Sequence, residues 1–255
     1  MAVDFRRDGV RSSPVWDVLS AVVSARSAAT GRTALDIVDV GGGTGGLAVP
    51  FAVLGHNVTV VDPSPDALAA AQRRAAEAGA RLTSVQGEAA SLDSLVGPAD
   101  LVICHNVLEY VDEPAAAMSA IARVLRPSAT VSVLASNAVA AVLHRALAGR
   151  FAEARVLLIS GGTTPVDPPR TGGLPAPPFP PGRRFTLPEL TALLEQAGLR
   201  AGEAHGLRIF TGLVPGALLD GDAAATEALR ALEEAAASTP PLRDIAAQLH
   251  VLGHR

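Results

Sequence analysis

A short buried strand that leads directly into a cluster of glycines constrains the fold of this chain more than any other feature. Residues 34–40 (ALDIVDV) form a mostly apolar run, which is typical of a strand covered on both faces. Gly41–Gly46 follow at once, and a helical segment comes after them. Strand, glycine turn and helix make up the first βα unit of a doubly wound α/β fold.

Further βα units follow with clear boundaries. A second strand at residues 57–61 ends at Asp62, and Ser64 with Pro65 supplies an N-cap and a first-turn proline for a helix that stops near Gly79. Alternation of this kind predicts a parallel sheet. The next expected elements are strands at 81–86, 100–104 and 130–134, with an apolar-periodic helix that ends before Pro127.

The regular pattern fails across residues 161–184, where prolines and glycines crowd together, so a loop, lid or insertion is expected there. Order resumes at Thr186, which forms a capping box with Glu189 and begins a helix that closes at Gly198. A sixth strand at 199–205, an Ala-rich helix at 222–237 and a last strand at 246–252 complete the expected elements.

Composition excludes several classes of protein. The single cysteine, Cys104, rules out an internal disulfide and a cysteine-based zinc cluster. The longest apolar stretch, residues 131–143, is too short and too polar to span a bilayer, and charges within residues 4–11 interrupt any secretory signal, so we expect a cytoplasmic protein. The histidines lack metal-ligand spacing, and no metal is predicted. The net charge of −4 argues against general nucleic-acid binding, although arginines between residues 145 and 184 favour a local anionic partner.

The glycine cluster admits two ligands. Gly41, Gly43 and Gly46 satisfy the G-x-G-x-x-G pattern, and Asp62 lies about 20 residues on, so a nicotinamide-dependent oxidoreductase is one interpretation. Asp39, however, stands two residues before Gly41, where its charge would repel a pyrophosphate. A ligand with ammonium and sulfonium groups would be attracted, and glycines at 41–43 let the backbone approach it closely.

These residues resemble the class I S-adenosylmethionine-dependent methyltransferases: the glycine loop, Asp62 at the end of the second strand, and residues 86–89 (QGEA) after the third. The end of the fourth strand, residues 104–111 (CHNVLEYV), is similar to that of the tRNA 5-carboxymethoxyuridine methyltransferases. The likeness extends to Arg11 with Trp16, Ser136-Asn137 and residues 149–151, 185–198 and 206–210.

The resemblance implies S-adenosylmethionine as methyl donor and assigns roles to individual residues. By it, Arg11 reaches the methionyl carboxylate, Gly41 and Gly42 the cofactor through their backbone, Asp62 the ribose, Ala89 and Ala90 the adenine edge, and His105 the cofactor or acceptor side. Asp39, Gly43 and Glu88 complete the expected cofactor-binding set. Asn137, Arg208 and Phe210 are the candidate substrate residues, and no catalytic residue is assigned.

We therefore expect one Rossmann-like domain with a doubly wound, seven-stranded, mostly parallel sheet and helices on both faces. Its expected parts are a helical lead-in (1–33), the cofactor-binding core (34–136), a Pro/Gly-rich cap or loop (145–185) and a C-terminal part that completes the sheet (186–255).

The expected reaction is methyl transfer to a small-molecule or modified-tRNA acceptor, such as the carboxylate of a wobble uridine or a small acid, with no membrane partner and no inferable protein partner. An ionised carboxylate would need no general base. Two alternatives remain: the nicotinamide-dependent oxidoreductase, and a catalytically degenerate S-adenosylmethionine-binding protein, because Thr44 stands where the relatives usually carry an acid.

Overall fold

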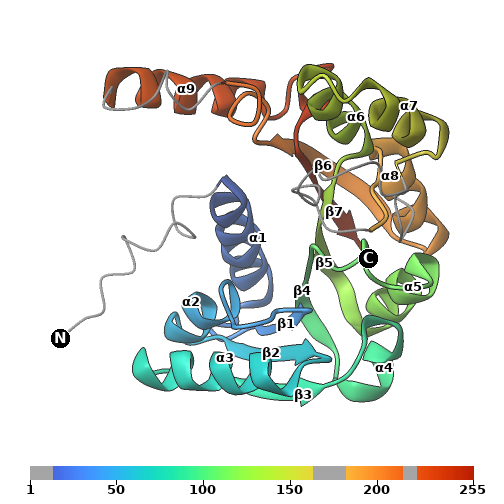
Figure 1. Ribbon diagram of the computed structural model, residues 1–255. Coiled ribbons are helices and arrows are strands. Elements are labelled where there is room, and N and C mark those ends of the chain that lie inside the picture. The colour runs from blue at the N-terminus through green and yellow to red at the C-terminus, as the bar shows by residue number, and fades with distance from the viewer. Residues whose placement is uncertain (1–13, 163–181, 215–222) are drawn as a thin grey trace. The chain divides into compact units, whose positions relative to one another are not determined.

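A computed structural model describes residues 14–162, 182–214 and 223–255, and these form the expected α/β fold. Seven strands make one sheet in the order β3-β2-β1-β4-β5-β7-β6 (Figure 1). The strands are β1 (Asp36–Val40), β2 (Asn57–Asp62), β3 (Thr83–Gln86), β4 (Ala99–His105), β5 (Leu125–Ser136), β6 (Arg200–Leu207) and β7 (Gln248–His254). The helices are α1 (Pro14–Thr30), α2 (Ala48–Val53), α3 (Pro65–Glu77), α4 (Leu92–Leu95), α5 (Pro114–Val124), α6 (Ala138–Leu147), α7 (Phe151–Ile159), α8 (Leu187–Gln196) and α9 (Ala223–Ala236), with short 3-10 turns η2 (Ala89–Ser91) and η4 (Arg243–Ile245).

The first five strands of the sheet order are parallel, as the βαβ pattern predicts. Parallel pairs join β1 to β2 and β4, β2 to β3, and β4 to β5. Strand β7 runs the other way: Arg255 N–H donates to Ala129 O (3.0 Å) near the start of β5, whereas Asn137 N–H donates to Ala247 O (3.1 Å) beyond its end. The sheet is therefore mixed, with one antiparallel strand inserted next to β5.

The helix caps predicted from the sequence are present at α3 and α8. Ser64 caps α3 by accepting a hydrogen bond from Ala67 N–H (3.3 Å), and Pro65 is the first helical residue. At α8 the capping box is complete, because Glu189 accepts from Thr186 N–H (2.7 Å) while Thr186 Oγ1 accepts from Glu189 N–H (3.4 Å).

Two helices were not foreseen between the fifth strand and the Pro/Gly-rich segment. The stretch 145–185 was expected to be a cap or loop. Its first part instead contains the end of α6 and all of α7. Helix α7 carries apolar residues on all sides, so no helical periodicity marks it in the sequence. Residues 163–181, which contain most of the Pro/Gly-rich segment, lie outside the described residues.

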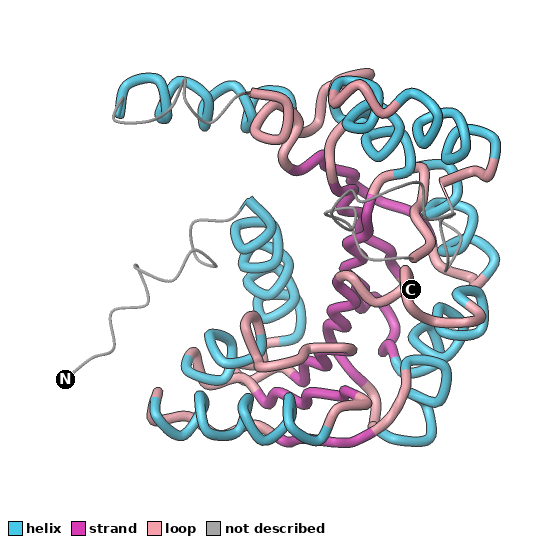
Figure 2. The backbone as a smooth tube through the Cα atoms, viewed as in Figure 1, coloured by secondary structure: helices cyan, strands magenta, loops and turns pink. Residues whose placement is uncertain are grey.

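Two compact units make up the chain. The first comprises Met1–Leu134, Thr191–Glu203 and Val251–Arg255, and the second Ala135–Leu190 and Ala204–His250. In the first unit, α1 and α2 lie on one side of the strands, and α4 and α5 on the other (Figures 1 and 2). Trp16 of α1 stacks on Phe51 of α2, with ring centroids 4.6 Å apart. Across the described helices of both units, none combines the length and apolarity needed to traverse a bilayer.

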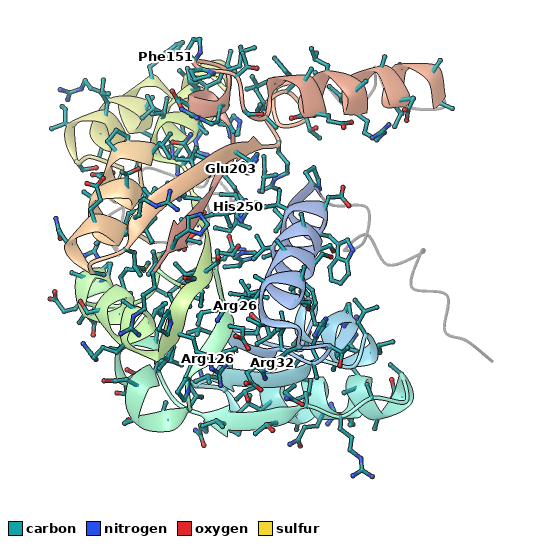
Figure 3. The ribbon with its side chains drawn as sticks, turned by 180° about the vertical axis from the view of Figure 1, so that it is seen from behind. Arg26, Arg32, Arg126, Phe151, Glu203 and His250 are labelled. Atoms are coloured by element: carbon teal, nitrogen blue, oxygen red, sulfur yellow. The ribbon has the colours of Figure 1, made fainter. Side chains whose placement is uncertain are left out.

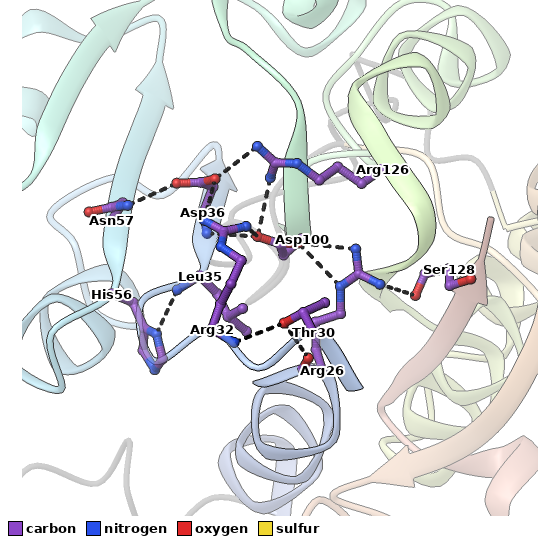
Figure 4. A network of polar contacts seen from close by, with 10 residues as sticks. All are labelled: Arg26, Thr30, Arg32, Leu35, Asp36, His56, Asn57, Asp100, Arg126 and Ser128. Atoms are coloured by element: carbon purple, nitrogen blue, oxygen red, sulfur yellow. Dashed lines mark hydrogen bonds and ion pairs between the residues drawn. The ribbon is translucent and has the colours of Figure 1, made fainter. Parts of the chain in front are cut away.

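An ion cluster binds the amino ends of the central strands together (Figures 3 and 4). Asp100, at the start of β4, is 1% exposed, and its carboxylate accepts from Arg26 Nη2 (3.1 Å), Arg32 Nη1 (2.6 Å) and Arg126 Nη1 (3.1 Å). It also accepts from the backbone N–H of Asp36 at the start of β1 (3.0 Å). One buried carboxylate thus joins α1, β1, β4 and β5.

We predict that Asp100→Asn destabilises the protein by about 1–3 kcal/mol, because the buried carboxylate loses its charge-assisted hydrogen bonds to three arginines. Urea unfolding of both proteins measures the difference. The matched control is Asp93→Asn, which breaks the more exposed Asp93–Arg123 pair (2.6 Å) and should change the unfolding midpoint little. Equal effects of the two substitutions would contradict the assignment.

Candidate functional site

Strand register places the sequence-predicted site residues side by side at the carboxyl edge of the sheet. Val40 pairs with Val61 on one side and with Cys104 on the other, while Asp62 pairs with Gln86. The next residue along each of these strands therefore lies on one line. That line contains Asp62, Gly41 and His105, and Gln86 of β3 joins it as the register partner of Asp62.

The glycine turn is closed on one side and open on the other. Gly41 has φ +63°, and a Cβ there would collide with Val107 in the turn after β4. A Cβ on Gly42 would lie 2.7 Å from the carboxylate carbon of Asp39. Gly43, also with positive φ (+53°), would carry its Cβ with no heavy atom within 4 Å. The open side at Gly43 leaves the backbone accessible to a ligand.

Two carboxylates lie beneath this turn. Asp39 is 3% exposed and accepts a hydrogen bond from Ala48 N–H at the start of α2. Burial, together with the negative charge of Asp62, raises the pKa of Asp39 to about 7 despite that hydrogen bond. Asp62 accepts from Gly43 N–H and Ser64 N–H, both at 2.9 Å. A carboxylate has about four acceptor sites, so two remain on Asp62 for hydroxyl groups of a ligand.

The residues after β3 close one end of the line. Gly87 N–H donates to Asp62 O (3.2 Å), which fixes the end of β3 against the end of β2. The turn η2 follows, with Ala89 buried and with Glu88 and Ala90 exposed. The backbone bond of Gly87 thus brings the exposed Glu88 near the end of β2.

His105 closes the other end. Its Nε2 shares a hydrogen bond of 2.7 Å with the hydroxyl of Ser132, a fully buried residue of β5. Burial lowers the pKa of His105 to about 3, so its imidazole is neutral at physiological pH. Sequence reasoning missed Ser132, although a polar residue in the middle of an apolar strand is a signal that its hydroxyl has a partner.

Asn137 does not serve an acceptor, contrary to its prediction as a substrate residue. It is 1% exposed, and its amide nitrogen donates to Asp244 O (2.9 Å) and Ala246 O (2.7 Å). Its amide oxygen accepts from Val139 N–H (2.9 Å) and caps α6. These bonds use both amide donors, so Asn137 has a structural role.

The segment around Arg208 and Phe210 is held from α9. Glu233 accepts from the backbone N–H groups of Ile209 (2.7 Å), Phe210 (2.9 Å) and Thr211 (2.7 Å). Phe210 is half-buried and packs on a small apolar cluster that includes Ile209, whereas Arg208 is exposed with φ +57°. A substrate role for Arg208 stays a prediction.

Two further expectations concern Arg11 and the binding of a metal ion. Arg11 lies outside the described residues. Over residues 14–162, 182–214 and 223–255, no three His, Cys, Asp or Glu side chains are grouped as a metal site requires.

Comparisons with known proteins agree with this geometry. Residues 37–128 match the family model described as a methyltransferase domain. The chain is 31% identical over 145 residues to the tRNA 5-carboxymethoxyuridine methyltransferase of Escherichia coli K12, covering 56% of this chain and 54% of that protein. It is 30% identical over 174 residues to the ubiquinone biosynthesis O-methyltransferase of Xylella fastidiosa 9a5c, covering 68% and 63%. The chain thus spans between half and two thirds of these relatives.

Solved structures share the fold at low identity. A S-adenosylmethionine-dependent methyltransferase from Mesorhizobium loti superimposes with a TM-score of 0.57 at 18% identity, covering 97% of this chain and 100% of that one. Magnesium protoporphyrin IX methyltransferase from Synechocystis PCC 6803, with bound SAH, gives 0.55 at 19% identity, covering 99% and 88%.

Residues 37–128 thus resemble a methyltransferase domain, and the chain shares its fold with solved S-adenosylmethionine-dependent methyltransferases of class I. Within that class, its curated relatives include the tRNA 5-carboxymethoxyuridine and ubiquinone biosynthesis enzymes. These matches are methyltransferases, and they lend no support to the alternative of a nicotinamide-dependent oxidoreductase.

We predict that Gly42→Ala destabilises the protein by about 1–3 kcal/mol, because the added methyl group overlaps the buried Asp39 carboxylate. Gly46→Ala in the same loop is the matched control, since its Cβ would meet no heavy atom within 4 Å. The control should leave the unfolding free energy unchanged or slightly raised. Urea unfolding of the three proteins distinguishes crowding at Asp39 from a general intolerance of alanine in the loop.

Proposed function

We propose that this chain binds S-adenosylmethionine at the line Gln86–Asp62–Gly41–His105 and transfers its methyl group to an anionic oxygen acceptor. The observation that carries the proposal is the pair of carboxylates, Asp39 and Asp62, at adjacent strand ends beneath a glycine turn that is open at Gly43. This arrangement suits a ligand with hydroxyl groups and positive charge.

The donor groups present fit that cofactor better than a dinucleotide. The two free acceptor sites of Asp62 match a pair of ribose hydroxyls, and the exposed Glu88–Ala90 edge beside it leaves room for a base. Asp39 would face an ammonium group, which lowers the cost of keeping that carboxylate ionised. A pyrophosphate at the same turn would add negative charge to two acids.

When bound, S-adenosylmethionine supplies an electrophilic methyl group on a sulfonium. The residues of the chain have to align the acceptor with it and exclude water, and such alignment contributes roughly 7–11 kcal/mol to a two-reactant step. His105, being neutral, adds no positive charge beside a sulfonium and provides hydrogen-bonding capacity at the acceptor side. With an ionised carboxylate or phenolate acceptor, no side chain has to remove a proton first.

The acceptor class follows from the relatives and from the charges of the chain. The two curated relatives are named for a carboxymethoxy group on tRNA uridine and for ubiquinone biosynthesis. Both names point to acceptors with an oxygen that can be ionised. Arg208 is an exposed cation of the second unit. A tRNA carboxylate and a small organic acid are the two candidate acceptors.

Isothermal titration calorimetry with S-adenosylmethionine, S-adenosylhomocysteine and NAD tests the proposal. We expect micromolar binding of the two sulfur nucleotides and none of NAD. Asp62→Ala should weaken binding by at least about tenfold, because two ribose hydrogen bonds to a charged acceptor are lost. Asp66→Ala, an exposed acid on α3, is the control and should bind normally. Circular dichroism verifies that both variants are folded.

Binding of NAD alone, or of no nucleotide, would overturn the proposed function. Where binding is confirmed, transfer of a radiolabelled methyl group to bulk tRNA and to a panel of carboxylic acids separates the two acceptor classes. Binding with no transfer to any acceptor would favour the degenerate binding protein, for which Thr44 is the sequence argument.

Affinity should depend on pH through Asp39. Its pKa of about 7 in the unliganded protein means that the carboxyl is largely protonated at pH 6, whereas an ammonium ligand binds the ionised form. We expect S-adenosylhomocysteine to bind about tenfold more weakly at pH 6 than at pH 8, with proton release on binding at pH 6.

Asp39 also changes the stability of the unliganded protein with pH, in the direction opposite to that of a carboxylate paired with a cation. Because the folded-state pKa is raised, the unliganded folded state retains the proton longer than the unfolded chain, and this group opposes folding increasingly between pH 4 and pH 7. Asp39→Asn should bind weakly at every pH without the pH dependence. A pH-independent affinity in the unsubstituted protein would contradict the role of Asp39.

A further inference from the structure

We propose that Ser132 is a positioning residue that fixes the imidazole of His105 against the edge of the cofactor site. This inference rests on the proposed function, since it concerns the same site. Ser132 lies inside the sheet, where it cannot itself touch cofactor or acceptor, and it acts only through His105.

Strand geometry brings the two side chains to one face of the sheet. In the parallel pair β4–β5, Ile103 is the register partner of Ser132, and His105 follows Ile103 by two residues. Side chains two residues apart share a face, so His105 and Ser132 project to the same side. The ring extends back along the strand to reach the hydroxyl at 2.7 Å.

Ser132 places a polar group within an apolar run of β5. Ser132 is 0% exposed among apolar residues of β5, including Val131 and Val133, where an alanine or valine would pack without a polar group. The other buried hydroxyl of this run belongs to Thr130, which shares a hydrogen bond with His254 (3.2 Å), away from the cofactor site. A buried hydroxyl needs a hydrogen-bond partner, and the short bond to His105 Nε2 satisfies Ser132 while it holds the ring.

The bond has a chemical consequence for the ring. Burial is the cause that lowers the pKa of His105, whereas burial, Glu109 and Asp39 together raise the pKa of the adjacent Cys104. A ring held inward by Ser132 stays buried and neutral. A released ring would meet water and gain a proton more easily, placing a second cation beside the sulfonium.

The experiment compares two ligands that differ by that positive charge. S-adenosylmethionine carries a sulfonium and S-adenosylhomocysteine does not, whereas both carry the ammonium group that Asp39 faces. The ratio of their dissociation constants therefore cancels the titration of Asp39 and reports the charge on His105. In the unsubstituted protein we expect this ratio to be the same at pH 5 and pH 8.

In Ser132→Ala, we expect the ratio to shift about tenfold against S-adenosylmethionine between pH 8 and pH 5, as for an imidazole whose pKa has risen to about 6. Ser132→Thr, which keeps the hydroxyl, should restore the unsubstituted behaviour. Thr130→Val is the matched control, because it removes a buried hydroxyl of the same strand that contacts His254. NMR of ¹⁵N-labelled histidine follows the protonation of His105 directly.

A constant ratio in Ser132→Ala, with His105 still neutral at pH 5 by NMR, would overturn the inference and leave the proposed function intact. Failure of the unsubstituted protein to bind either ligand would instead overturn the proposed function. Should Ser132→Ala not fold, Ser132→Cys provides the second test, because a thiol is only a weak hydrogen-bond donor. The ratio should then shift against S-adenosylmethionine between pH 8 and pH 5, and a constant ratio in this variant would disprove the assignment.

Discussion

The buried carboxylate of Asp100 is the interaction on which the first unit depends. It joins the amino ends of β1 and β4 directly, and it binds α1 and β5 through Arg26 and Arg126. Asp100 itself is fully buried, so its charge has to be balanced by these partners. Once the amino ends of neighbouring strands are fixed, register determines where their carboxyl ends lie. The alignment of Gly41 with His105 follows from this.

The buried acids at the two edges of the sheet differ in how their charge is compensated. At the amino edge, guanidinium groups surround Asp100, and its charge is neutralised within the protein. At the carboxyl edge, burial and the negative charge of Asp62 raise the pKa of Asp39, and a hydrogen bond from a backbone N–H offsets this only in part. An acid that its own protein compensates poorly is best stabilised by a cationic ligand. The structure thus places its rigid ion pairs away from the site and its unbalanced charge within it.

Much of the site was predictable because its signals are local. The strand-to-glycine transition, Asp39 two residues before Gly41, and Asp62 at the end of the next strand all lie within short segments whose spacing fixes their geometry. Asn137 was misassigned for the opposite reason. Its position after a strand suits either a helix cap or a ligand contact, and the carbonyls of Asp244 and Ala246 that occupy its amide come from far along the chain.

Sequence by itself determined the parallel βαβ core, the capped starts of α3 and α8, and the set of acids and glycines that meet at the carboxyl edge. Those features depend on periodicity, turn chemistry and neighbours within a few residues. Only the tertiary structure decided that β7 runs antiparallel beside β5, that α7 is a helix, and that Ser132 holds His105. Each of these depends on partners brought together from distant parts of the chain. Such contacts stabilise the fold, but the local sequence pattern does not reveal them.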